Sequence, residues 1–253
     1  MLFKFFLSDI LPIRSDHYPE LFFDEHIEEI RQRTFQTMIF LGLLMILAFC
    51  FVKPIVGILQ VPVSNIKFFQ LSPGEYFLST LKISFYTGLS FGIPVLLSQL
   101  MFFLAPGLNE NEKKTTFGLL TFSVILLFLG LIFSYKILIP AAVKFFISYN
   151  DEVIEPLWSF EEYFGFISVL FFGTSLVFQL PIIQIILCLI KVITPKLMFS
   201  VWRYMILFAT IIGAVLTPSA DPITQILLSS ALFFLYLAGC FISLILTEKS
   251  FSF

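Results

Sequence analysis

Six long runs without a charged side chain constrain this chain more than any other feature of its sequence. In chain order they are Thr34–Val52, Ile83–Asn109, Thr115–Tyr135, Tyr163–Ile190, Tyr204–Ala220 and Pro222–Thr247. A helix needs about 20 apolar residues to cross the hydrocarbon core of a bilayer, and each run is near or above that length. Because 58% of the residues are hydrophobic, 13% are charged and 35 of 253 are Phe, we expect the chain to fold in lipid.

The runs predict an all-α integral membrane protein with six transmembrane helices. Asp221 alone separates the last two runs, and the fifth and sixth spans are expected to be short. The longest connection, Pro140–Glu162, is expected to form a structured cap. We treat residues 1–253 as a single polytopic domain with three parts: an amino-terminal segment 1–33, a six-helix core 34–247 and a tail 248–253.

Basic residues at the ends of the runs predict the orientation, because cytoplasmic loops of membrane proteins are enriched in Lys and Arg. One side would carry Lys4, Arg14, Arg31, Arg33, Lys113, Lys114, Lys191, Lys196, Arg203 and Lys249. The other side would carry Lys53, Lys67 and Lys144 with the acids Glu75, Asp151, Glu152, Glu155, Glu161, Glu162 and Asp221. We therefore expect both termini on the cytoplasmic side, or on the stromal side of a plastid membrane.

The titratable residues argue against several classes of function. Both histidines precede residue 27, and the three cysteines, Cys50, Cys188 and Cys240, are scattered in apolar runs as small hydrophobes are. The basic residues form no patch of the kind that binds nucleic acid. The chain also lacks the Gly-x-x-x-x-Gly-Lys loop of nucleotide-binding proteins, so no cofactor is expected.

Several connections carry the chemistry of helix starts. Ser72–Glu75, Asn109–Glu112 and Ser159–Glu162 have the spacing of a capping box, and Asp221 stands before Pro222 as an N-cap. Spacing alone therefore favours a capping role for Glu112. Glu29 lies in a string of mixed charges, which is typical of a solvated helix face.

The order of short motifs resembles the TatC family of twin-arginine protein translocases. The motifs are His26-Ile-Glu-Glu29-Ile-Arg31-Gln-Arg33, Leu71-Ser-Pro-Gly-Glu75, Ile93-Pro94, Phe103-Leu-Ala-Pro106-Gly-Leu108, Glu112-Lys-Lys114, Phe178-Gln179-Leu-Pro181 and Leu216-Thr-Pro218 with Asp221. They extend from about Asp24 to Leu246, in the family's order and between the corresponding spans. The resemblance implies the family's fold over this part of the chain.

The same resemblance implies a function in protein transport and no enzymatic activity. TatC-like proteins bind the twin-arginine signal peptides of folded precursor proteins. They recruit single-span TatA-type and TatB-type subunits, self-associate, and use the proton-motive force and no cofactor. The resemblance places signal-peptide binding at Glu29, Arg31 and Glu112, and partner or structural roles at Pro62, Pro94, Phe103, Gln179, Pro181 and Asp221. On the residues alone, Pro94 and Pro181 are ordinary helix kinks.

Gln179 departs from the family pattern, because many bacterial members carry Glu inside the fourth span. A charged side chain at membrane depth costs roughly 2.5 to 3.5 kcal/mol on insertion scales. An amide can form hydrogen bonds between helices at lower cost. We therefore expect Gln179 to offer a neutral polar contact to a partner helix and not a titrating group.

The stretches Leu59-Gln-Val-Pro62 and Thr217-Pro-Ser-Ala-Asp-Pro222 resemble the cyanobacterial and plastid branch of the family. The amino terminus contains Pro12 and has neither a small-residue cleavage site nor a Ser-rich transit peptide. With the abundant Phe and Ile, this favours a protein encoded in an algal plastid and located in the thylakoid membrane. The alternatives are a cyanobacterial or other bacterial inner membrane, or another organelle membrane of an alga.

Two other classes of membrane protein fit the charge pattern less well. A small-solute transporter normally has paired ionisable groups or broken helices near the bilayer midplane, whereas the charges here gather at span ends. An intramembrane protease needs a catalytic pair at depth, and no run contains Asp, Glu or His well inside it.

The orientation gives a first testable prediction. A cysteine introduced at Glu110, beside Lys113 and Lys114, should react with a membrane-impermeant thiol reagent only from the cytoplasmic or stromal side. A cysteine at Glu155 should react only from the opposite side, with the three native cysteines replaced in both proteins. The reverse labelling pattern would contradict the predicted orientation.

Overall fold

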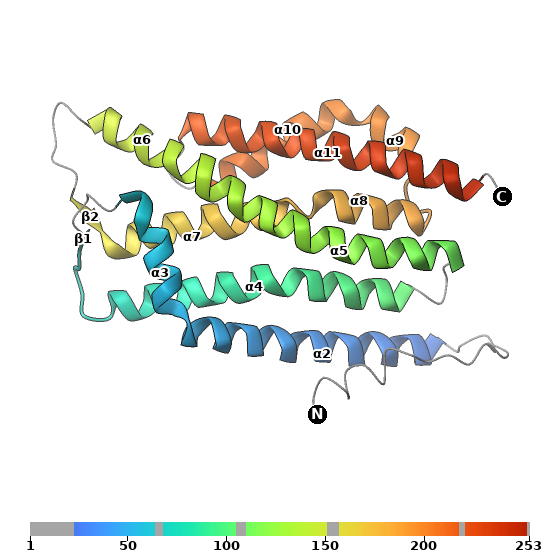
Figure 1. The fold of residues 1–253 in the computed structure, drawn as a ribbon, viewed down its shortest axis with the longest axis horizontal. Coiled ribbons are helices and arrows are strands. Elements are labelled where there is room, and N and C mark those ends of the chain that lie inside the picture. Colours follow the sequence, from blue (N-terminus) through green and yellow to red (C-terminus); the bar gives the residue numbers. More distant parts are fainter. Residues whose placement is uncertain (1–22, 64–67, 105–109, 151–156, 218–220, 252–253) are drawn as a thin grey trace. The chain divides into compact units, whose positions relative to one another are not determined.

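The computed structural model of this chain describes residues 23–63, 68–104, 110–150, 157–217 and 221–251 (Figure 1). The chain divides into two units, residues 1–36 and 37–253, and each is described by itself. The long helices are α2 (Phe23–Cys50), α4 (Glu75–Leu104), α5 (Glu110–Phe133), α7 (Phe160–Val177) and α11 (Pro222–Phe251). The shorter helices are α3 (Val52–Gln60), α6 (Ile139–Asn150), α8 (Leu180–Leu189), α9 (Pro195–Ser200) and α10 (Trp202–Leu216). A 3-10 turn, η1 (Val61–Val63), and a π-helical turn, η3 (Ser134–Leu138), complete the helical segments.

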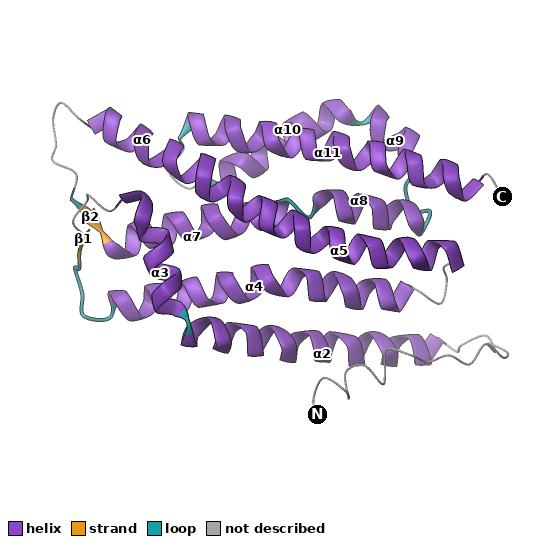
Figure 2. Cartoon of the chain, viewed as in Figure 1, coloured by secondary structure: helices purple, strands orange, loops and turns teal. Residues whose placement is uncertain are grey.

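Helices make up nearly all of the described chain, which confirms the predicted all-α membrane protein (Figure 2). Five stretches are long and apolar enough to cross a membrane: Ile27–Cys50, Glu75–Leu104, Gly118–Tyr149, Phe160–Leu189 and Pro222–Leu246. The fifth apolar run forms α10, which has 15 residues and is shorter than the roughly 20 needed for a full crossing. The helix of the fifth run is therefore short, as predicted, and the six-span topology stays a prediction.

The prediction of a short sixth span is wrong. The apolar part of α11 extends over 25 residues, Pro222–Leu246, which is enough for a full crossing. The charge-free run Pro222–Thr247 was itself long enough, and α11 is helical along all of it.

The third span is longer than the charge-free run predicted, because α5 continues through η3 into α6 without a break. The expected cap over Pro140–Glu162 is therefore helical as far as Asn150. Within η3, the buried hydroxyl of Ser134 donates to the carbonyl of Leu170 on α7 at 3.2 Å. Lys136 lies on the exposed side of the same turn, so a positive charge does not end the helix.

Within residues 37–253, each long helix packs against particular neighbouring helices. α4 packs against α5 and α7, and α11 packs against α8 and α10. One end of this unit carries β1 (Phe68–Phe69) and β2 (Trp158–Ser159), and the other carries the ends of α8 and α11 (Figure 1). Gly88 permits the contact of α4 with α2, because a Cβ there would lie 2.8 Å from the Cα of Met45.

The Glu75 carboxylate joins two connections at the strand-bearing end. Its Oε2 accepts hydrogen bonds from the backbone N–H of Leu71 at 2.6 Å and of Ser72 at 3.3 Å. Its Oε1 accepts from the Ser159 hydroxyl at 2.6 Å and from the Glu161 N–H at 3.1 Å. The side chain is buried, so all four bonds form away from bulk water. A single acid thus caps its own helix and the first turn of α7.

These bonds decide the outcome for two predicted capping boxes. The Ser72–Glu75 box is confirmed on the Glu side, because Glu75 accepts from the Ser72 N–H. The Ser159–Glu162 box is wrong, because Ser159 makes no side-chain cap bond and donates to Glu75 instead. The parallel pairing of β1 with β2, Phe68 opposite Trp158 and Phe69 opposite Ser159, brings the two connections together.

We predict that Glu75→Gln destabilises the protein by about 1–3 kcal/mol, because the amide NH2 cannot accept and leaves a buried donor unsatisfied. The measurement is the heat-induced loss of the monodisperse peak in detergent. Glu28→Gln is the matched control, since Glu28 is exposed and pairs with Arg31 on its own helix, at 2.6 Å. Such surface pairs contribute about 0–1 kcal/mol. Equal losses in both variants would contradict the linking role of Glu75.

Candidate functional site

The amino-terminal part of α2 carries two of the residues that the sequence assigned to signal-peptide binding. The Oε1 atom of Glu29 accepts from Nε of Arg33 at 2.9 Å and from its Nη2 at 2.6 Å. Arg31 donates to Glu28 at 2.6 Å from a largely exposed side chain. One turn of helix explains both pairs, since residues three and four apart share a helix face. Glu29 therefore already binds a guanidinium group within its own helix.

Glu112 lies in the first turn of α5, but its side chain is outside the described residues. Its predicted capping and binding roles both stay predictions. Glu29 and Glu112 also belong to the two separately described units of the chain. Their convergence on one ligand is therefore a prediction as well.

Gln179 lies at the break between α7 and α8 and is almost completely buried, at 1% exposure. Its amide Nε2 donates to the backbone carbonyl of Ser123 on α5 at 3.0 Å. The Ser123 hydroxyl donates back to Gln179 Oε1 at 2.8 Å. This reciprocal pair is a neutral polar contact between two helices of the same chain. Contact of Gln179 with a partner helix stays a prediction.

The backbone around Gln179 explains why the side chain reaches α5. Pro181 falls in the first turn of α8, where the N–H that proline lacks has no partner inside the helix. The preceding break is closed by bonds from Gln179 N to Leu176 O at 3.0 Å and from Ile182 N to Gln179 O at 3.0 Å. On α5, a Cβ at Gly130 would lie 2.9 Å from the Cα of Ser175. The glycine therefore permits the close approach that this pair requires.

The other predicted structural residues occupy separate places in the fold. Pro62 is half-buried in η1, Pro94 lies inside α4, and Phe103 is half-buried near the end of α4. Asp221 is fully buried and caps α11: its Oδ1 accepts from the Ile223 N–H at 2.9 Å. In the described part of the chain, no observed contact joins these four residues and Gln179 into one cluster.

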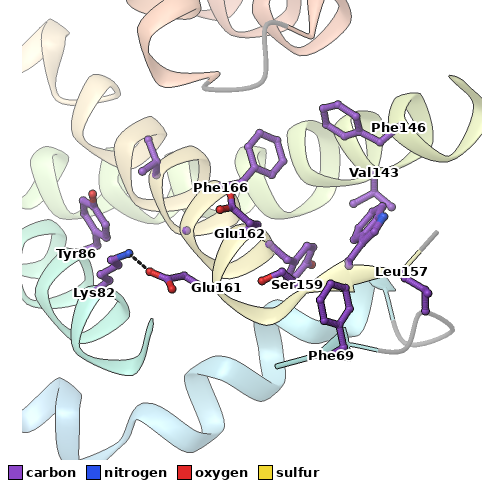
Figure 3. A pocket seen from close by; sticks show the side chains of 14 residues that line it. Phe69, Lys82, Tyr86, Val143, Phe146, Leu157, Ser159, Glu161, Glu162 and Phe166 are labelled. Atoms are coloured by element: carbon purple, nitrogen blue, oxygen red, sulfur yellow. Dashed lines mark hydrogen bonds and ion pairs between the residues drawn. The ribbon is translucent and has the colours of Figure 1, made fainter. Parts of the chain in front are cut away.

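The strand-bearing end contains an ion pair and a pocket that motif reasoning missed. Lys82 Nζ on α4 lies 2.6 Å from Glu161 Oε1 on α7 (Figure 3). Beside this pair is a pocket of about 800 Å³ whose wall includes Phe69, Trp158 and Glu162. The partners are 79 residues apart in the chain, so no local spacing could have revealed them.

Comparison with known proteins identifies similar sequences over most of the chain. A family model described as "Sec-independent protein translocase protein (TatC)" matches residues 25–230. The tatC-like protein ycf43 of Trieres chinensis is 57% identical over 220 residues, which cover 87% of this chain and 84% of that protein. The "Sec-independent protein translocase protein TATC, chloroplastic" of Oryza sativa subsp. japonica is 44% identical over 217 residues, which cover 85% of this chain and 60% of that protein.

A solved structure is also similar in fold. The "Crystal Structure of Twin Arginine Translocase Receptor- TatC" matches with a TM-score of 0.76 and 31% sequence identity. The match covers 88% of this chain and 99% of that chain. Most of the chain therefore shares its fold with that receptor.

The reciprocal bonds between Gln179 and Ser123 predict an energetic coupling. Gln179→Leu should lower thermal stability in detergent, because it leaves the buried Ser123 hydroxyl and carbonyl without that partner. A double-mutant cycle with Ser123→Ala should give a coupling of about 0.6 kcal/mol, the mean for hydrogen bonds between membrane helices, and at most about 1.7 kcal/mol. Additive effects of the two substitutions would show that the pair contributes no net stability.

Proposed function

The chain belongs to the TatC family of Sec-independent protein translocase proteins, and from this we propose that it is the receptor subunit of a twin-arginine translocase. The family is a non-enzymatic component of protein transport. The single observation that supports the receptor role is the likeness in both sequence and fold to the solved twin-arginine translocase receptor.

The proposed ligand is the twin-arginine signal peptide of a folded precursor protein. Two adjacent guanidinium groups require acids at the membrane surface, where charge-assisted hydrogen bonds from Arg to carboxylate are short and strong. We assign this role to Glu112 and Glu29, with Arg31 beside Glu29. The bonds from Arg33 support the assignment of Glu29, because they demonstrate that its carboxylate accepts a guanidinium. A signal-peptide arginine would compete with Arg33 for that oxygen.

The proposed partners are single-span subunits of the TatA and TatB types, together with further copies of the chain. The proposed energy source is the proton-motive force. Gln179, in the fourth span of this chain, is the proposed polar contact for a helix of a partner subunit. Since its amide is neutral, this contact would not depend on a titrating carboxylate at membrane depth.

The proposed location is the thylakoid membrane of a plastid, with six spans and both termini on the stromal side. The chain is a multi-pass membrane protein, and its relatives include chloroplast and algal ycf43 proteins. The basic residues that flank the apolar runs support this orientation.

We predict that Glu112→Gln weakens binding of a twin-arginine precursor by about 1–3 kcal/mol, up to roughly a hundredfold, because an arginine loses its charged partner. Gln is also accepted in a capping box, so this substitution removes the charge while retaining much of the capping ability. The measurement is crosslinking of a twin-arginine precursor and of its twin-lysine variant in detergent extracts.

Three further variants separate cargo binding from capping. Glu110→Gln is the matched control, because it changes an acid in the same turn of α5 and should leave precursor binding unchanged. Glu112→Ala reports the capping role through thermal stability, and Glu29→Gln tests the second proposed carboxylate. An undiminished preference for arginine over lysine in folded Glu112→Gln protein would refute the binding role of Glu112.

A further inference from the structure

The pocket at the strand-bearing end has the size of a small-molecule site. Its volume of about 800 Å³ lies within the range of 300–1,000 Å³ typical of ligand pockets. α4, α6 and α7 contribute to its wall together with Trp158, and Phe69 and Leu157 lie at one side (Figure 3). All of these residues belong to the unit 37–253.

The pocket extends from the strand pair into the spans. Lys82 follows the first residue of α4 by seven positions, about 10 Å along the helix axis, and Val169 follows the start of α7 by about 13 Å. With the starts of these helices placed at the bilayer surface, side chains at these depths would meet lipid headgroups and the first carbons of acyl chains. Trp and Tyr are enriched at this level of membrane proteins. Trp158 and Tyr163 lie here as a stacked pair with ring centroids 5.7 Å apart.

The charged groups of the pocket do not cancel. Its wall contains one ammonium, Lys82, and two carboxylates, Glu161 and Glu162, which leaves one negative charge. Lys82 pairs with Glu161. Glu162 lies between Ser159 and Phe166 (Figure 3), its side chain is exposed, and no ion pair of it is found in the described part of the chain.

Apart from Ser159, the remaining wall is mostly apolar and largely aromatic. Phe146 and Phe166 meet edge to face, with ring centroids 5.8 Å apart, and Tyr86 lies beside the ion pair (Figure 3). Gly165 also lines the pocket, and a Cβ added there would meet no atom within 4 Å. No side chain therefore fills the space directly beside this glycine.

These features together specify one ligand chemistry. The aromatic wall and the space beside Gly165 suit an acyl chain. The unpaired carboxylate of Glu162 suits a group that donates hydrogen bonds, and the aromatic faces attract an ammonium by cation–π interaction. The net negative charge repels an anionic headgroup.

We propose that this pocket binds a glycerolipid of the surrounding bilayer whose headgroup donates hydrogen bonds and carries no net negative charge. Either an ammonium, as in an ethanolamine phospholipid, or the hydroxyls of a glycosyl diacylglycerol supply that chemistry. Glu162 receives the donor group, Lys82 faces the polar part of the lipid, and one acyl chain lies along Phe166 past Gly165. This proposal does not depend on the proposed receptor function.

Trp158 provides a direct readout, because the chain contains two tryptophans and Trp202→Phe leaves Trp158 as the only one. The full chain is reconstituted in bilayers that contain equal parts of an ethanolamine phospholipid, a galactosyl diacylglycerol and phosphatidylglycerol. In each sample one of the three lipids carries brominated acyl chains, and bromine quenches tryptophan fluorescence. The lipid composition is therefore constant, and the samples differ only in which lipid carries the quencher. Quenching of Trp158 fluorescence then reports which lipid occupies the pocket.

We expect one or both neutral lipids to quench Trp158 about threefold or more above phosphatidylglycerol, in keeping with the strength of cation–π and carboxylate contacts. The two neutral arms distinguish an ammonium from a sugar headgroup. Glu162→Gln should bring the ratio of neutral to anionic quenching close to one. Gly165→Leu should reduce quenching by all three lipids, because the side chain fills the space. Gly118→Leu is its control, since a Cβ there also meets no atom within 4 Å.

Thermal stability of each variant is measured alongside, and Gly165→Leu keeps the test valid if Glu162→Gln fails to fold. The proposal would be overturned by equal quenching by all three lipids in the native pocket, by strongest quenching by phosphatidylglycerol, or by unchanged quenching in Gly165→Leu. An unquenched Trp158 in every bilayer would likewise overturn it, and would favour a polypeptide as the occupant.

Discussion

The need to satisfy every backbone polar group inside the chain governs this fold, because hydrocarbon offers no hydrogen bonds. The break in the fourth span obeys it: backbone bonds close the turn at Gln179, and Pro181 contributes no N–H there. The end of α8 obeys it too. Lys191 takes a left-handed φ of 59°, which lets the Val192 N–H reach Leu187 O at 3.1 Å. Non-helical backbone thus occurs where local bonds replace the helical ladder.

The same solvent changes how helices attract one another, since lipid tails are as apolar as leucine and association relies on close packing and polar contacts. The face of α5 toward α7 illustrates this. Ser123 bonds to Gln179, Gly130 permits backbone contact with Ser175, and Ser134 donates to Leu170 O. These three positions lie seven and four residues apart and therefore share one helix face. Small and polar side chains therefore add to the apolar contacts between these helices, such as those of Leu127 and Leu131.

Local patterns in the sequence predicted the features that depend on neighbouring residues. The apolar runs located the long helices, and Asp221 before Pro222 predicted the cap of α11. Long-range partners left no such trace. Ser159 has the spacing of a cap for α7, yet its hydroxyl bonds to Glu75, 84 residues away. The sequence did not predict the π-helical turn η3 for a related reason. The position of Ser134 against α7 depends on the carbonyl of Leu170, which is distant in the chain.

The internal bonds of Gln179 set a condition on any role in partner contact. Ser123 engages one N–H and one oxygen lone pair of the amide, and the side chain is buried, so a partner helix reaches Gln179 only where this contact opens. Exchange of one hydrogen bond for another changes the free energy little, whereas loss without replacement costs the desolvation of a buried group. A partner that offers both a donor and an acceptor could therefore replace Ser123 at low cost. A partner with an apolar side chain at that depth could not, so Gln179 would select partners by polarity and not by charge.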